Sequence, residues 1–93
     1  MEYLEVDFQA AKFNKQVEQA LSTLTFLERT ILSMRRGITH PILSSEEIAA
    51  LCHTTQKRVD DIEKKAVRKM QHPVRMRLLE CLPDGLKQKF IGE

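Results

Sequence analysis

Apolar residues recur every three or four positions along most of the chain, which is the spacing of one face of an α-helix. From residue 3 to about residue 22 the repeat is carried by Leu4, Phe8, Ala11, Val17, Ala20 and Leu21. A second repeat follows Thr25, which stands three residues before Glu28 in the spacing of a capping box. It stops at Gly37, a residue suited to the C-terminal cap of a helix. The pattern therefore predicts a helix over 3–22 and a second helix over 26–36.

The next part of the pattern predicts two helices joined by a tight turn. Ser44 or Ser45 is expected to cap the first of them, whose buried side is formed by Ile48, Ala49 and Cys52. His53 falls in the turn, where a left-handed backbone is usual. Thr55 is expected to cap the second helix, and its apolar stripe consists of Val59, Ile62, Ala66 and Met70. A short helix followed by a longer one at this spacing is typical of a helix-turn-helix.

Proline closes this long helix and can begin another. Pro73 suits the first position of a fifth helix, which would carry Val74, Met76, Leu78, Leu79 and Leu82. Pro83 and Gly85 are expected to end it, and residues after 85 read as a loose tail. We predict an all-α chain of about five helices: an N-terminal helix over 1–24, a helix-turn-helix domain over 25–84 and a C-terminal tail over 85–93.

Positive charge gathers in the second half of the chain. The 93 residues carry a formal net charge of only +2, but between Lys57 and Arg77 there are eight basic residues and three acidic ones. Hydrophobic residues make up 42%, enough to build a core. A basic helix within a helix-turn-helix is the usual electrostatic mark of a nucleic-acid-binding protein.

Several classes of protein are not expected. The sequence has no phosphate-binding glycine loop, zinc-protease motif or nucleophile motif, so we expect no enzyme, cofactor or small-molecule ligand. Cys52 and Cys81 lie in apolar patterns without metal spacing, so they read as packing residues of a reduced, cytoplasmic protein with no metal site. No apolar run reaches the length of a membrane span, and no secretion signal is expected.

Four segments in order resemble domain 4 of the sigma-70 family, the bacterial transcription initiation factors. Ala20 to Ile38 resembles the family's opening segment, and Glu46 to Ala49 resembles its "EEIA". Val59 to Met70 resembles "V..IE.KALRKL", and His72 to Arg75 resembles "HPSR". The resemblance covers about residues 20–84. It implies a sigma domain 4-like helix-turn-helix fold whose partners are the β flap of RNA polymerase and the −35 promoter element.

The resemblance places a DNA-binding face on the predicted long helix. Residues facing the groove would be Thr55, Gln56, Lys57, Arg58 and Asp61. The family usually reads bases with Arg, Glu and Gln where this chain has Gln56, Lys57 and Asp61. Phosphate contacts would come from Lys64, Lys65 and Arg68.

Two acidic residues stand against DNA binding on this face. Asp60 replaces an arginine that commonly contacts the backbone in the family, and Asp61 adds a second negative charge. Affinity for DNA comes largely from neutralising phosphates, which two carboxylates oppose.

The resemblance also implies a surface for RNA polymerase. Phe26, Leu27, Ile31 and Leu32 would contribute to the core and to the flap-binding surface, and the sequence does not say which of them are exposed. Leu51 stands where the family usually has a polar residue and is a further candidate partner contact.

Three functions remain open at this stage. The first is a transcription-initiation module that binds polymerase, with promoter DNA as a second expected partner. The second is a sigma-like interaction module that has lost base reading and acts on polymerase or through another regulator of sigma type. The third is a dimeric repressor whose apolar N-terminal helix, Leu4 to Leu21, forms the dimer contact.

Overall fold

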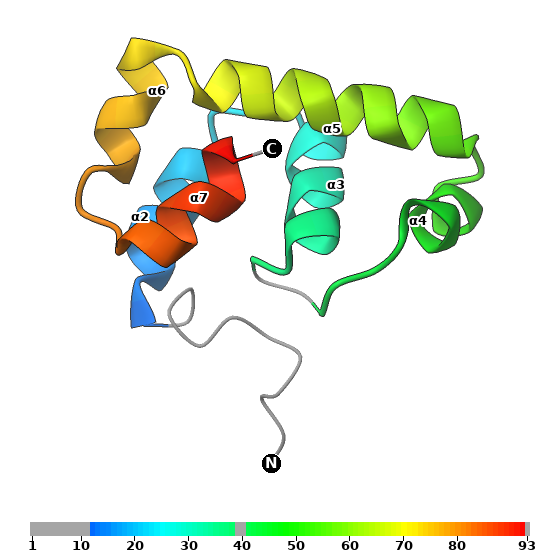
Figure 1. The fold of residues 1–93 in the computed structure, drawn as a ribbon, viewed down its shortest axis with the longest axis horizontal. Coiled ribbons are helices and arrows are strands. Elements are labelled where there is room, and N and C mark those ends of the chain that lie inside the picture. Colours follow the sequence, from blue (N-terminus) through cyan, green and yellow to red (C-terminus); the bar gives the residue numbers. More distant parts are fainter. Residues whose placement is uncertain (1–11, 39–40, 93) are drawn as a thin grey trace.

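The computed structural model describes residues 12–38 and 41–92, and this part of the chain is helical without a β-strand. Its elements are α2 (Asn14–Leu21), α3 (Phe26–Arg36), α4 (Ser45–Leu51), α5 (Gln56–Met70), α6 (Pro73–Met76), the 3₁₀ helix η1 (Arg77–Leu79) and α7 (Asp84–Ile91). The long helix α5 runs along one side of the molecule (Figure 1). Helix α4 lies at its N-terminal end, α3 at its middle, and α2, α6 and α7 gather at its C-terminal end. The all-α prediction is confirmed.

The predicted caps are present and fix where the central helices begin and end. Thr25 and Glu28 form the capping box of α3, and Ser44, not Ser45, caps α4. Gly37 ends α3 in the left-handed conformation, with φ 65°. There the carbonyl of Ser33 accepts from the amide of Gly37 and also from the amide of Ile38, the latter at 3.1 Å.

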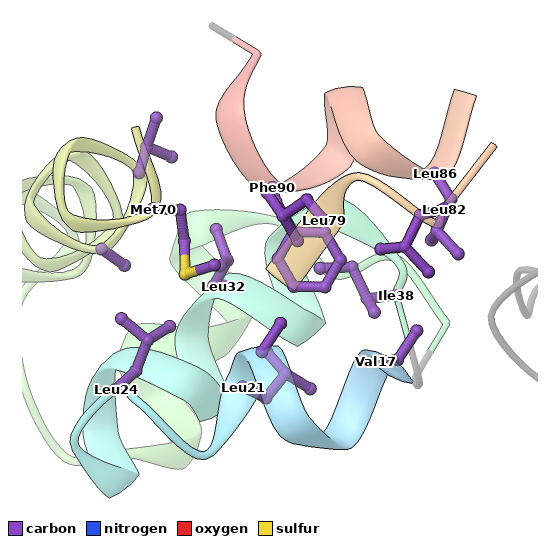
Figure 2. Packing of buried hydrophobic residues seen from close by; sticks show 13 residues of the cluster. Val17, Leu21, Leu24, Leu32, Ile38, Met70, Leu79, Leu82, Leu86 and Phe90 are labelled. Atoms are coloured by element: carbon purple, nitrogen blue, oxygen red, sulfur yellow. The ribbon is translucent and has the colours of Figure 1, made fainter. Parts of the chain in front are cut away.

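Two apolar clusters hold the helices together, and α3 separates them. The larger cluster joins α2, α3, the second half of α5, η1 and α7; Figure 2 shows the side chains of Met70, Leu79 and Phe90 among those within it. The smaller cluster lies under the helix-turn-helix and contains Ile31, Ile48, Ala49 and Val59. Neighbouring residues of α3 therefore serve different clusters, because Ile31 faces the smaller one and Leu32 the larger one.

The C-terminal residues differ from the sequence prediction. The expected loose tail is wrong, since Asp84–Ile91 forms α7 and its Leu86 and Phe90 have no exposed surface. The side chain of Arg36 donates to the carbonyl of Gly92. The side-chain amide of Gln71 donates to the carbonyl of Ile91 at 2.9 Å. The carbonyls at the end of α7 are therefore capped by side chains that are distant in the sequence, so the local sequence of α7 does not predict its end.

The predicted fifth helix is shorter than expected. Helix α6 lasts one turn and gives way to η1. Leu79 and Leu82 are buried in the larger cluster, Met76 and Leu78 pack against it, and Val74 stays exposed. Cys81 is exposed, so its prediction as a packing residue is wrong. The part of the predicted N-terminal helix before residue 12, with Leu4, Phe8 and Ala11, lies outside the described residues.

Candidate nucleic-acid interface

The turn between α4 and α5 begins with a regular C-terminal cap of α4. His53 adopts φ 54°, as the sequence predicts for a left-handed turn position. The amide of Thr54 donates to the carbonyl of Ala49 at 2.9 Å, and that of His53 donates to Ala50 at 3.4 Å. This pair of bonds is a Schellman motif, which reverses the chain within three residues. It sets the angle at which α5 leaves α4.

Side chains then fix the first turn of α5. The hydroxyl of Thr55 accepts from the amide of Arg58 at 3.2 Å, which confirms the predicted cap. The amide nitrogen of Gln56 donates to the hydroxyl of Ser45 at 2.9 Å, so the first residues of the two helices are joined. Ser45 is buried, whereas Gln56 is exposed. Gln56 retains its oxygen and a second N–H for an outside partner.

The predicted DNA-facing residues lie on the exposed side of α5. Thr55, Gln56, Lys57, Arg58, Asp61, Lys64, Lys65 and Arg68 are all exposed. The ammonium of Lys57 and the carboxylate of Asp61, one helical turn apart, form an ion pair at 3.3 Å. Among the described residues, Lys64, Lys65 and Arg68 make no ion pair. The three predicted phosphate contacts are therefore open to solvent.

Asp60 and Asp61, the two acidic residues expected to oppose DNA binding, both lie among basic side chains. Asp61 borders a hollow also lined by Thr55, Lys57, Arg58, Ile62 and Lys65. Asp60 is half-buried on the other flank of α5, in a groove of about 560 Å³. That groove is also lined by Arg35, Arg36, Glu63, Lys64, Val67, Arg68 and Gln71. In each place the basic residues outnumber the acidic ones.

Two charged residues of α5 face inward and fix the helix to α3. Glu63 accepts from Arg35 at 3.2 Å and from Arg36 at 2.7 Å. Lys69 pairs with the buried carboxylate of Glu28 at 2.9 Å. Burial alone would raise the pKa of Glu28, but its bonds to Lys69 and to the amide of Thr25 lower that pKa overall. The sequence pattern missed these supporting roles, since the partners lie 27, 28 and 41 positions away.

The predicted polymerase-binding residues divide by exposure. Phe26 is 79% exposed and Leu51 is 61% exposed, so both can touch a partner. Leu27 is half-buried at the edge of the smaller cluster. Ile31 and Leu32 have no exposed surface and act as core residues in this structure.

Other kinds of site are not apparent in the described ranges, 12–38 and 41–92. No group of three or more His, Cys, Asp or Glu side chains there could hold a metal ion. None of the helices in that part of the chain has the length and apolar character needed to cross a membrane.

Comparison with known proteins agrees with this geometry. The family model for sigma-70, region 4, matches residues 20–72, which contain α3, α4, the turn and α5. The RNA polymerase sigma factor SigA1 of Synechococcus elongatus is 39% identical over 67 residues. The RNA polymerase sigma factors SigA of Microcystis aeruginosa and of Synechocystis sp. are each 36% identical over 67 residues.

These matches cover 71% of this chain but only 16–17% of the length of the three sigma factors. Helix α7 lies beyond the end of the family match at residue 72. The matched part nevertheless includes more than half of the chain and all of the helix-turn-helix. The chain is a member of the sigma-70 region 4 family, with that family's DNA-binding helix-turn-helix.

Proposed function

We propose that the chain is a transcription-initiation module that contacts promoter DNA through α5 and RNA polymerase through an apolar surface at the start of α3. The observation that carries the DNA part is the charge of the exposed side of α5. Five cations stand there (Lys57, Arg58, Lys64, Lys65 and Arg68) against Asp60 and Asp61. Both carboxylates lie among basic side chains, so the face as a whole attracts phosphates.

The −35 promoter element is the proposed DNA target. Membership of the family supports this choice, as does the exposure of Gln56, Lys57 and Asp61 at the start of α5. A recognition helix reads bases mainly with its N-terminal residues, which enter the major groove. Lys64, Lys65 and Arg68 continue along the same helix and would contact the phosphate backbone.

The test is a titration of a fluorescent duplex with a −35-type hexamer and of a scrambled duplex, at low and at moderate salt. We expect tighter binding to the hexamer, and binding to both duplexes that weakens as salt rises. Lys64→Ala with Arg68→Ala should weaken both complexes about equally, because phosphate contacts carry no sequence information. Equal binding of both duplexes that disappears at moderate salt would refute promoter reading.

Phe26 is the proposed main contact with the β flap of RNA polymerase. Large apolar side chains so exposed are candidates for a protein interface, and Phe26 is the most exposed large apolar residue described. Phe26→Ser should reduce the affinity for purified polymerase core, measured by biolayer interferometry. Val74→Ser is the matched control, because Val74 is 67% exposed but lies on α6. Equal effects of the two substitutions, or no effect of either, would contradict this contact.

A second function is favoured by Asp60 and Asp61, which would suit a module that binds polymerase but no longer reads DNA. The double substitution Asp60→Arg with Asp61→Gln separates the two functions. If the chain has lost DNA reading through these residues, the double variant should gain binding to the hexamer that the natural sequence lacks. If the natural sequence already binds the hexamer tightly, the second function is excluded.

A further inference from the structure

We infer that Lys57 and Asp61 together read one G·C base pair, in a single orientation. This inference rests on the proposed function, since it assumes that α5 enters the major groove. The two side chains extend from the exposed side of the first turns of α5 and meet at 3.3 Å. Their exposed fractions are 85% and 59%, so neither is held by the protein core.

The spacing of the ion pair matches that of a base-pair edge. In the major groove, guanine presents the acceptors N7 and O6, and cytosine presents the N4 amino donor beside O6. O6 and N4 are hydrogen-bonded to each other in the pair, so they lie about 2.9 Å apart. An ammonium and a carboxylate 3.3 Å apart offer the opposite pattern, a donor beside an acceptor. Lys57 can donate to O6 while Asp61 accepts from N4.

This pattern favours G·C over the other three pairs. An A·T pair also presents a donor beside an acceptor, since Asp61 could accept from adenine N6 while Lys57 donates to N7 or to O4. On guanine, however, the ammonium finds two neighbouring acceptors, N7 and O6, whereas A·T offers it one acceptor on either side of the N6 donor, so the preference over A·T rests on this second acceptor. A reversed C·G pair would place the carboxylate of Asp61 against the acceptors of guanine, which repels it. We therefore expect the reversed pair to be the least favoured of the four.

The ion pair can do this at little cost to the protein. An exposed pair of this kind, one turn apart on a helix, is weak in water because the solvent screens it. Exchanging part of its attraction for hydrogen bonds to bases therefore costs little. It also lets Asp61 enter the groove with its charge offset by Lys57, among the other cations of the hollow.

The experiment uses a −35-type hexamer in which each position in turn carries A·T, T·A, G·C or C·G. Binding is measured by fluorescence anisotropy for the unchanged chain and for three variants. For the unchanged chain, we expect one position where G·C is bound about tenfold more tightly than C·G. Lys57→Met should remove this preference and weaken binding to every duplex.

Asp61→Ala gives the decisive comparison. It removes a negative charge, so all duplexes should bind more tightly, but the preference for G·C over C·G should fall several-fold. Asp60→Ala is the matched control: it removes the same charge from the preceding residue, which lacks the ion pair with Lys57. It should strengthen binding while leaving the preference unchanged.

The outcomes separate the inference from the proposed function. If the unchanged chain binds the hexamer but Asp61→Ala and Asp60→Ala behave alike, Asp61 only repels DNA and the inference is wrong, while promoter binding stands. A preference for A·T at the position sensitive to Lys57 would also overturn it. If no duplex binds above the scrambled control, both the inference and the promoter-binding proposal fail. Circular dichroism of each variant confirms that the helices remain folded.

Discussion

Among single residues, Ser45 has a role that its position in the sequence does not suggest. Its buried hydroxyl accepts from the side-chain amide of Gln56, so this side chain is already oriented before DNA binds. A glutamine can read adenine through two hydrogen bonds in the major groove, and adenine is the base we expect Gln56 to read. We expect Ser45→Ala to lower that preference for adenine, at a stability cost of about 1 kcal/mol. Anisotropy on the duplex panel checks this. Ser22→Ala, on the exposed end of α2, should change neither quantity.

The buried pair of Glu28 and Lys69 predicts how stability depends on pH. The pKa of Glu28 lies below its ordinary value of 4.5. As the pH falls, the unfolded chain therefore takes up this proton first. The stabilisation is present above pH 4.5 and is lost as the pH falls through the lower pKa of the folded state.

Lys69→Met tests this pair. It should lower the free energy of unfolding at pH 7 by about 2 kcal/mol, because the hydrogen bond to a buried charged group is lost. The difference from the unchanged chain should shrink at pH 3, as seen by urea denaturation at both values. Lys65→Met, which changes an exposed lysine of the same helix without an ion pair, should have little effect at either pH. A pH-independent loss of stability in Lys69→Met would contradict the assignment to Glu28.

At the scale of elements, α7 belongs to the core rather than to a tail. Phe90 is fully buried, so Phe90→Ala removes a large side chain from the larger cluster. We expect a loss of about 3–5 kcal/mol in the free energy of unfolding, measured by urea or thermal denaturation. Lys87→Ala on the same helix is the control and should change stability by less than about 0.5 kcal/mol. A loss that small for Phe90→Ala would mean that α7 contributes little to the fold.

The sequence predicted elements well where local chemistry decides them. The boundaries of α3, α4 and α5 follow from Thr25, Gly37, Ser44 and Thr55, whose hydrogen bonds stay within a few residues. Helix α7 was missed because it has no side-chain N-cap, and the carbonyls at its end accept from the side chains of Arg36, at the end of α3, and Gln71, just after α5.

For the candidate site, the sequence predicts which residues are exposed but not which contacts are made between helices. Exposure of the DNA-facing set follows from the apolar stripe of α5, which leaves the opposite side to solvent. The bond between Gln56 and Ser45 and the inward turn of Glu63 were not predictable, since each depends on how two helices cross.

For the molecule as a whole, charge distribution matters more than the net charge of +2. Glu63 and Glu28 are paired internally, so the outer side of α5 stays basic. If Lys64, Lys65 and Arg68 each contact one phosphate, the logarithm of the binding constant should fall with the logarithm of salt with a slope of about −3. Removing one of the three should reduce the slope by about one. A slope near zero would mean that these residues do not touch DNA.

The small cluster beneath the helix-turn-helix has a consequence for local unfolding. The cluster that includes the buried side of α4 has four buried residues, compared with thirteen in the larger cluster. Helix α4 should therefore open transiently while the second half of α5 stays closed, and its amide protons should exchange with deuterium sooner. Binding to a duplex should slow exchange in α4 more than elsewhere. Part of the free energy of DNA binding would then be spent on ordering α4, which would link the tightness of the complex to the packing of Ile48 and Val59.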